Sequence, residues 1–314
     1  MVGSPKKPLY FSLYPRLILV ITVICVLIIG ATLLIGQHLQ FHGDVIAFVG
    51  RSRGNLDIYT LTFDRNLPGM TQNLTDNFAD DTAPVWSPDG SRIAFVSEID
   101  GRPNIYTMNI SGDDRQQLTH FRGVNDFVHM LAWSPDGTQL AFTSNFENQW
   151  HLYVMDSNGD NVRQLWDGVI VTSPIDWSPD GTQIIFTANG ATNQELFVLE
   201  LATGEVHALT DDIHWDAAPK WSPDGTQIVY RSHRGGNFGI YILDETDGTI
   251  ARLTDRFSEN FDPVWSPDAS RILFLSRGAR TPVTQLYLMN ADGSNSQRLS
   301  TGVRGDHYSP SWRP

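Results

Sequence analysis

The sequence has one cysteine and few basic residues, and each shortage excludes a class of protein. Cys25 is the only thiol among 314 residues, so the chain can form neither an internal disulfide nor a cysteine-based metal site. Residues 1–36 carry Lys6, Lys7 and Arg16 and no acidic residue, which leaves 19 basic against 35 acidic side chains in the remainder. Because so acidic a surface repels phosphate backbones, we expect no nucleic-acid partner.

Charge is also absent from residues 17–36, a mostly apolar run of 20 positions that contains Cys25. A helix of this length spans about 30 Å, the thickness of a bilayer core. A cleaved signal peptide is the alternative, but its apolar region is typically ~7–15 residues long and ends in a small-residue cleavage site, which is missing here. The sequence therefore predicts a transmembrane helix at 17–36, with a cytoplasmic tail at 1–16 and the remainder outside the cytoplasm.

What the sequence does contain, from residue 44 onward, is a repeat. Tryptophans recur 47, 44, 44, 44 and 47 residues apart. They are Trp86, Trp133, Trp177, Trp221, Trp265 and Trp312. The first five are followed by Ser-Pro-Asp-Gly or, once, Ser-Pro-Asp-Ala, then by two short apolar runs such as RIAFVS and NIYTM, and by a closing pair such as Leu-Thr. Short runs bounded by turn residues predict strands, and four strands per ~45 residues are typical of a β-propeller blade.

The two ends of the repeat supply complementary parts of one blade. Residues 44–75 contain the second, third and fourth strands of a unit whose first strand is missing, and residues 306–314 contain a first strand alone. Pairing these parts predicts an all-β, six-bladed propeller over 44–314, closed by the C-terminal strand, with 37–43 as a linker. Closure leaves no exposed edge strand.

The repeated pattern D-x-x-P-x-W-S-P-D-G, followed by IAF, IY and LT, resembles the PD40 (WD40-like) repeats of TolB-like propellers. The resemblance covers 44–314 and implies a protein-binding module without catalysis or cofactor, which lacks the α/β domain that precedes the TolB propeller. The resemblance does not identify the binding partner. Two alternatives stay open, namely a metal-dependent hydrolase or lyase with a site at the tunnel mouth, and a glycan-binding sensor.

Strand order also predicts which face is free to bind. If the first strand of each blade runs from top to bottom, the Ser-Pro-Asp-Gly turns lie on the bottom face, where the chain enters at Asp44. The irregular loops then lie on the top face, away from the membrane. Because rigid scaffolds usually present binding residues on such loops, we expect the partner there.

Candidate ligands lie five residues before each tryptophan, and we call these the ring positions because we expect them around the mouth of the central tunnel. With their neighbours, they give a candidate site made of Asp81, Asp216, Asn260, His307, Asp262 and His129. Oxygen and imidazole ligands of this kind suit Ca²⁺ or a transition metal. Aspartates at a repeat position can equally cap loops by accepting backbone N–H groups, and we expect no bound metal.

Further residues stand out from the repeat. Asp176 and Lys220, each directly before a tryptophan, are placed to pair across the tunnel wall. Aromatic residues outside the fixed positions are either anchors for a partner or part of the core, namely Trp150, Trp215, Phe127 and Tyr308. Gly50–Gly54 matches Gly-x-Ser-x-Gly but falls between two strands of one blade, whereas a nucleophile needs a strand–turn–helix.

Overall fold

The computed structural model describes residues 43–64, 67–121, 123, 127–145, 149–168, 170, 173–278 and 281–314. The predicted tail, the transmembrane helix and nearly all of the linker lie outside these residues, as does the ring position at 172. None of the described residues belongs to a helix that is long and apolar enough to cross a membrane.

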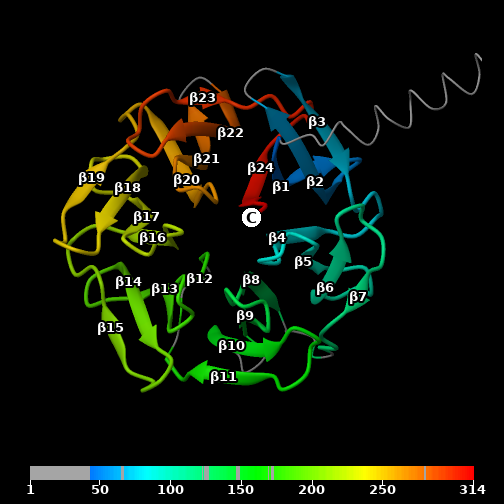
Figure 1. Cartoon of the computed structure of the whole chain (residues 1–314), viewed down its shortest axis with the longest axis horizontal. Helices are drawn as coiled ribbons and strands as arrows, with labels where there is room; N and C mark the ends of the chain where they lie inside the picture. The colour runs from blue at the N-terminus through cyan, green and yellow to red at the C-terminus, as the bar shows by residue number, and fades with distance from the viewer. Residues whose placement is uncertain are drawn as a thin grey trace, which may run out of the picture. The chain divides into compact units, whose positions relative to one another are not determined.

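The described residues form an all-β propeller of six four-stranded antiparallel sheets arranged around a centre (Figure 1). Blades 1 to 3 contain β24 (His307–Trp312), β1 (Asp44–Ser52), β2 (Asn55–Asp64), β3 (Leu67–Asn73); β4 (Asp81–Trp86), β5 (Arg92–Ser97), β6 (Asn104–Asn109), β7 (Gln116–Gln117); β8 (Val128–Trp133), β9 (Gln139–Ser144), β10 (His151–Asp156) and β11 (Arg163–Trp166). Blades 4 to 6 contain β12 (Asp176–Trp177), β13 (Gln183–Asn189), β14 (Gln194–Glu200), β15 (Val206–Ala208); β16 (Asp216–Trp221), β17 (Gln227–Ser232), β18 (Gly239–Asp244), β19 (Ile250–Arg252); β20 (Ser258–Trp265), β21 (Arg271–Gly278), β22 (Thr281–Asn290) and β23 (Gln297–Arg298).

Closure by the C-terminal strand is confirmed. β24 pairs antiparallel with β1, with Trp312 opposite Ile46 and His307 opposite Gly50 (Figure 1). The last strand of the chain is therefore the innermost strand of the blade that contains the first one.

The Ser-Pro-Asp-Gly segments form turns whose side chains bond within the turn. In the first copy, Ser87 Oγ donates to Asp89 Oδ1 at 2.6 Å, and Asp89 Oδ1 also accepts the Ser91 N–H at 3.0 Å. The glycine that follows adopts a left-handed φ of 64°, which explains why the repeat prefers glycine. Ala269 takes this place in blade 6 with a φ of 56°, so it adopts a conformation that is unfavourable for a residue with a Cβ.

The Gly-x-Ser-x-Gly match lies in the β1–β2 hairpin. Ser52 pairs with Asn55 across a two-residue turn made of Arg53 and Gly54, both with positive φ. Positive φ at both central residues is the signature of a type I′ hairpin turn. The segment is thus a tight turn between strands, as the sequence predicted.

The hydrophobic core is divided among the blade boundaries. The described buried residues fall into six clusters, and each lies between two consecutive blades. Indoles of the repeat link the blades as well, since Trp177 Nε1 donates to the Ala132 carbonyl and Trp265 Nε1 to the Lys220 carbonyl.

The antiparallel order of the strands defines two faces. The loops between second and third strands, and those that lead from one blade to the next, lie together on the top face. The Ser-Pro-Asp-Gly turns and the turns between third and fourth strands lie on the bottom face. Asp156–Asp160, which superficially resembles a calcium loop, begins one of these bottom turns, after β10.

Candidate functional site

The centre of the ring holds a narrow cavity of about 50 Å³, lined mainly by proline and apolar side chains from the first strands. Its lining residues are Ala83, Pro84, Val85, Met130, Leu131, Pro174, Lys220, Asp262, Pro263, Val264, Ser309 and Pro310. Of the predicted ligands, this lining includes only Asp262.

A backbone bulge decides which residues reach the cavity. Three positions before the tryptophan, several blades place a non-glycine residue with positive φ, as at Ala83 (51°) and Asp262 (44°). The pairing of β4 with β5 shifts here, between Thr82 and Val85. Since a bulge of this kind redirects the chain, the residues after it line the cavity and the ring positions before it do not.

The structure places the described polar ring residues at separate blade boundaries. Asp81, Asp216 and His307 are fully buried and Asn260 is 2% exposed. Each begins or lies near the start of a different first strand, and none lines the central cavity. Among the described residues, one group of three acidic, histidine or cysteine side chains is close enough to share a cation, and it contains only Asp216 of this set.

The other two predicted ligands lie elsewhere. Asp262 lines the cavity, where burial raises its pKa and the cations Arg231 and Lys220 oppose that rise. His129 is partly buried, and its ring meets Trp150 edge-on at 5.5 Å. Burial lowers the pKa of His129.

Two of the ring residues bond to a threonine that ends the preceding blade. Asn260 Nδ2 donates to Thr254 Oγ1 at 3.2 Å, and the same oxygen accepts the Ile240 N–H of β18 at 3.0 Å. His307 Nε2 lies 2.8 Å from Thr301 Oγ1. These contacts hold the third strand of one blade, or the segment after its fourth, against the first strand of the next.

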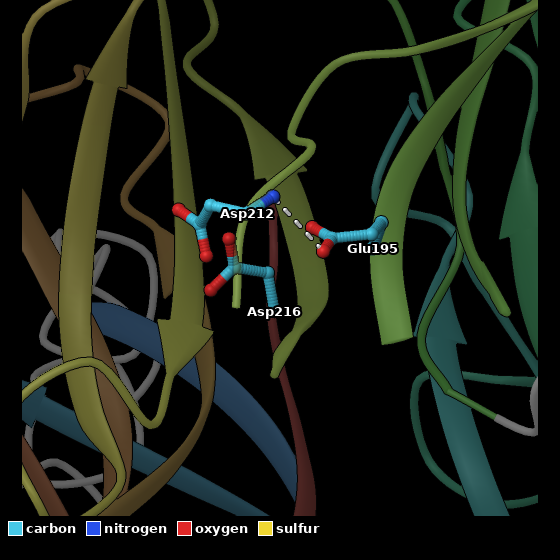
Figure 2. Close-up of side chains that lie close together, drawn as sticks. All are labelled: Glu195, Asp212 and Asp216. Carbon is cyan, nitrogen blue, oxygen red and sulfur yellow. Dashed lines mark hydrogen bonds between the residues drawn. The ribbon is translucent and has the colours of Figure 1, made fainter. Parts of the chain in front are cut away.

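The group that could share a cation lies at the top of the boundary between blades 4 and 5. Glu195 belongs to β14, Asp212 to the loop after β15, and Asp216 begins β16. One oxygen from each lies within 4.8 Å of the others. Figure 2 shows Glu195 reaching toward the two aspartates from the facing blade.

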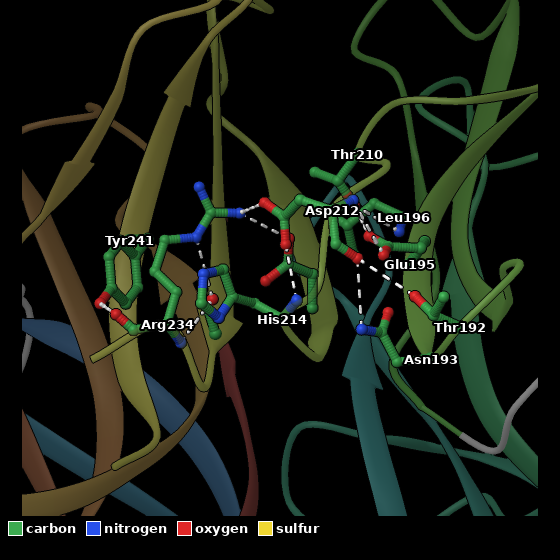
Figure 3. A network of polar contacts seen from close by, with 11 residues as sticks. Thr192, Asn193, Glu195, Leu196, Thr210, Asp212, His214, Arg234 and Tyr241 are labelled. Carbon is green, nitrogen blue, oxygen red and sulfur yellow. Dashed lines mark hydrogen bonds and ion pairs between the residues drawn. The ribbon is translucent and has the colours of Figure 1, made fainter. Parts of the chain in front are cut away.

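Arg234 supplies the positive charge for this group (Figure 3). Its Nη2 donates to Asp212 Oδ2 at 2.6 Å and to Asp216 Oδ2 at 2.9 Å. Glu195 accepts the Thr210 hydroxyl at 2.6 Å and the Asp212 N–H at 3.2 Å. The guanidinium therefore offsets part of the negative charge of the two aspartates, and the network fastens the loop after β17 to the blade boundary.

Burial raises the pKa of two carboxyls in this network. Desolvation is the main cause for both Glu195 and Asp216, and hydrogen bonds from Thr210, Ser232 and Arg234 only partly oppose it. Protonation of these groups is thus easier than in water.

Asp176 and Lys220 pair as the sequence predicted. Lys220 Nζ lies 3.2 Å from Asp176 Oδ1 and donates to the Ile175 carbonyl at 2.7 Å, while the Trp221 N–H donates to Asp176 Oδ2 at 3.0 Å. Strand β12 has only two residues and pairs with β13 at these two positions alone. The contact with β16 therefore helps to fix this short first strand.

The top face carries exposed apolar side chains where the chain enters four blades and on the first strand of another. We call this set the apolar rim, and it consists of Phe78 (100% exposed), Phe127 (42%), Ile213 (81%), Trp215 (53%), Phe257 (82%) and Tyr308 (36%). Of the predicted aromatic anchors, Trp215, Phe127 and Tyr308 belong to it. Trp150 instead packs against the core between blades 3 and 4.

The sequence profile of the TolB β-propeller domain matches residues 39–130, 114–212 and 147–314. The chain belongs to this family. A 44-residue stretch is 48% identical to the Tol-Pal system protein TolB of Alcanivorax borkumensis, covering 14% of this chain and 10% of that protein. The chain thus matches a small part of its curated relatives, and their activities and partners do not transfer with the match.

Solved structures agree with the family. The crystal structure of TolB from Acinetobacter baumannii superimposes with a TM-score of 0.75 at 26% identity, over 87% of this chain and 67% of that one. An oligogalacturonate lyase in complex with manganese gives a TM-score of 0.52 at 16% identity, over 82% of this chain and 74% of that one. So low an identity shows the fold alone.

In this TolB-type propeller, the sequence missed Glu195, Asp212 and Arg234 because their contacts join three separate loops and strands. It also missed Phe78, Ile213 and Phe257. For these a signal was present, since large apolar residues are unusual in polar loops between strands.

Proposed function

We propose that this TolB-type propeller binds a protein partner through its top face, and that a membrane helix at 17–36 holds it outside the cytoplasm. The apolar rim carries the proposal. Large apolar and aromatic side chains that cluster on one face are typical of protein interfaces, where buried aromatics supply much of the binding energy.

The bottom face lacks a comparable cluster among the described residues. Its exposed large apolar residues include Ile110, Val162 and Ile250, which lie in or directly after bottom turns of three different blades. The chain enters β1 at the bottom face, and the rim lies on the other face.

A metal-dependent enzyme is the weaker reading. It needs Asp81, Asp216, Asn260 and His307 to converge on one ion, and these residues serve separate blade boundaries. The one acidic group among the described residues is already neutralised in part by Arg234. Binding without catalysis therefore accounts for the geometry better.

Photo-crosslinking in cells tests the proposal. A benzoylphenylalanine placed at Trp215 or Phe257 should give a discrete heavier adduct, and the same probe at Ile110 or Val162 should not. Adducts of equal yield from both faces, or from the bottom face alone, would overturn it. Digestion of intact cells with an added protease, read by the loss of the 44–314 fragment, tests exposure outside the cytoplasm.

A further inference from the structure

One residue of blade 5 departs from all its counterparts in the repeat. Arg231 lies in β17 opposite Ala217, one residue before the end of the strand. The counterparts in the other blades are uncharged and at most 3% exposed, namely Val49, Val96, Thr143, Thr187 and Leu275. In the other blades this position is therefore part of the packed interior and carries a small or apolar side chain. Blade 5 has a cation there instead.

The guanidinium of Arg231 lies against two aromatic rings at the boundary of blades 5 and 6. Its Cζ is 4.9 Å from the ring centroid of Phe238, in the loop after β17, and 5.6 Å from that of Phe261 in β20. The Phe238 carbonyl accepts the Asn260 N–H at 2.9 Å, which fixes this loop against the next blade. Cation–π contacts thus orient the group without using its N–H donors.

Those donors have no acceptor among the described residues. Arg231 makes no ion pair with a described carboxylate, and its Nε is buried without a hydrogen-bond partner. The residue is half-buried, and its terminal nitrogens are not among the fully buried atoms that lack a partner. Asp262 supplies the nearby negative charge that opposes the effect of burial on the pKa of Arg231, but it lies beyond ion-pair distance.

Three neighbouring arginines already have partners. Arg234 pairs with Asp212 and Asp216, Arg277 pairs with Glu259, and Arg252 donates to backbone carbonyls and to the Tyr241 hydroxyl. A partly buried cation with no hydrogen-bond acceptor among the described residues is uncommon, because the loss of hydration has to be offset. Arg231 is therefore suited to bind an anion.

We propose that Arg231 binds the side-chain carboxylate of an aspartate or glutamate in the protein partner. This inference rests on the proposed function. The planar guanidinium suits a carboxylate, which it can bind through two parallel hydrogen bonds. The rim lies close by, since the carbonyl of Trp215 accepts the N–H of His233 at 3.0 Å, two residues beyond Arg231. The partner segment then combines apolar side chains on Trp215 and Phe257 with one acid on Arg231.

The probe comes from a library of random heptapeptides that are fused to phage through their C-termini. The library is selected on the full-length protein in detergent. We expect the enriched sequences to share an aspartate or glutamate next to apolar residues. A synthetic peptide of that sequence, amidated at its C-terminus, should lose about tenfold or more in affinity when its acid is changed to the amide, as expected for a charge pair with one partner removed. Arg231→Leu should weaken the acidic peptide by a similar factor and the amide peptide by little.

The repeat itself supplies the controls. Leucine occupies the equivalent position in blade 6, so Arg231→Leu should fold with an unchanged or higher Tm. Arg231→Lys keeps the charge and should retain part of the binding. Arg163→Leu, on the exposed outer strand β11, should bind the peptide as the parent does.

The two hypotheses fail in different ways. Enriched peptides that bind Arg231→Leu as tightly as the parent, or that lack an acid, overturn the role of Arg231 while binding on the rim stands. An absence of enrichment, or peptides that bind a Trp215→Ser, Phe257→Ser variant undiminished, overturns the proposed function and this inference with it.

Discussion

At the scale of single residues, the left-handed backbone of Ala269 is a weakness that the other turns avoid. We expect Ala269→Gly to stabilise the protein by about 1 kcal/mol, because glycine adopts positive φ without the penalty of a Cβ. Thermal melts of the purified protein would measure it. Gly181→Ala is the matched control, since its new Cβ would meet only Pro135 at 3.7 Å and the cost is conformational. Equal Tm values for all three proteins would contradict the explanation.

Arg234 is a second residue whose replacement has a defined outcome. Arg234→Met leaves Glu195, Asp212 and Asp216 without their cation, and removing one partner of a buried ion pair typically costs ~3–5 kcal/mol. Because Asp212 is partly exposed, we expect the lower end of this range. Millimolar CaCl₂ should restore part of the lost Tm in the variant and leave the parent unchanged, with or without EDTA. A parent protein that loses Tm in EDTA would show that a metal already binds.

Single residues also show how far sequence reasoning reaches. The pairing of Asp176 with Lys220 followed from their shared position in adjacent repeats, because equivalent strand positions lie side by side in a propeller. The network of Glu195, Asp212 and Arg234 did not, because loops outside the repeat bring them together. Positive φ at Ala83 and Ala218 has no local signal either, since alanine rarely adopts it.

At the scale of strands, the threonines of the repeat fall into two classes that predict opposite effects of the same substitution. Thr119 Oγ1 accepts the Ile105 N–H at 2.9 Å and donates to Asn104 Oδ1 at 3.0 Å. Thr143 Oγ1 is buried with no hydrogen-bond partner among the described residues. We expect Thr119→Val to cost about 1–3 kcal/mol and Thr143→Val to be neutral or stabilising.

Urea unfolding of the two valine variants would measure this contrast. Valine keeps the shape of threonine, so the comparison isolates the hydroxyl. Similar losses in both would mean that the hydroxyl of Thr143 has a partner such as bound water.

Strands were also the scale at which the sequence was most informative. Alternation, turn residues and the tryptophan spacing predicted the order of the four strands in a blade and the split of blade 1. They did not predict the bulge in the first strands. The bulge separates ring positions such as Asp81 from the cavity, so a tunnel-mouth ring was expected where the structure has separate boundary contacts.

At the scale of the whole molecule, carboxyls with shifted pKa values set how stability depends on pH. Burial raises the pKa of Asp81, Glu195 and Asp216, so their contribution is fully present below the unfolded pKa near 4 and is lost as the pH rises through their folded values. Hydrogen bonds in the bottom turns hold the pKa of Asp89 and Asp268 at about 2. The contribution of these two groups to the free energy of unfolding is therefore lost as the pH falls from about 4 toward 2.

The free energy of unfolding should therefore peak at mildly acidic pH and decline on both sides. Denaturant titrations across the pH range would map the curve. Asp216→Asn should flatten the neutral side, and Asp89→Asn the acidic side. A curve that rises continuously to pH 8 would show that the buried carboxyls are better solvated than their surroundings indicate.

The pairing of β24 with β1 also has a consequence for how the protein is made. Translation delivers β1 before the other strands of the propeller and β24 after them. Until β24 is made, β1 is therefore an unpaired edge strand of blade 1, and unpaired edge strands promote aggregation. A chain that stops before β24 leaves the ring open, so the pairing of β24 with β1 depends on nearly the whole propeller having been made.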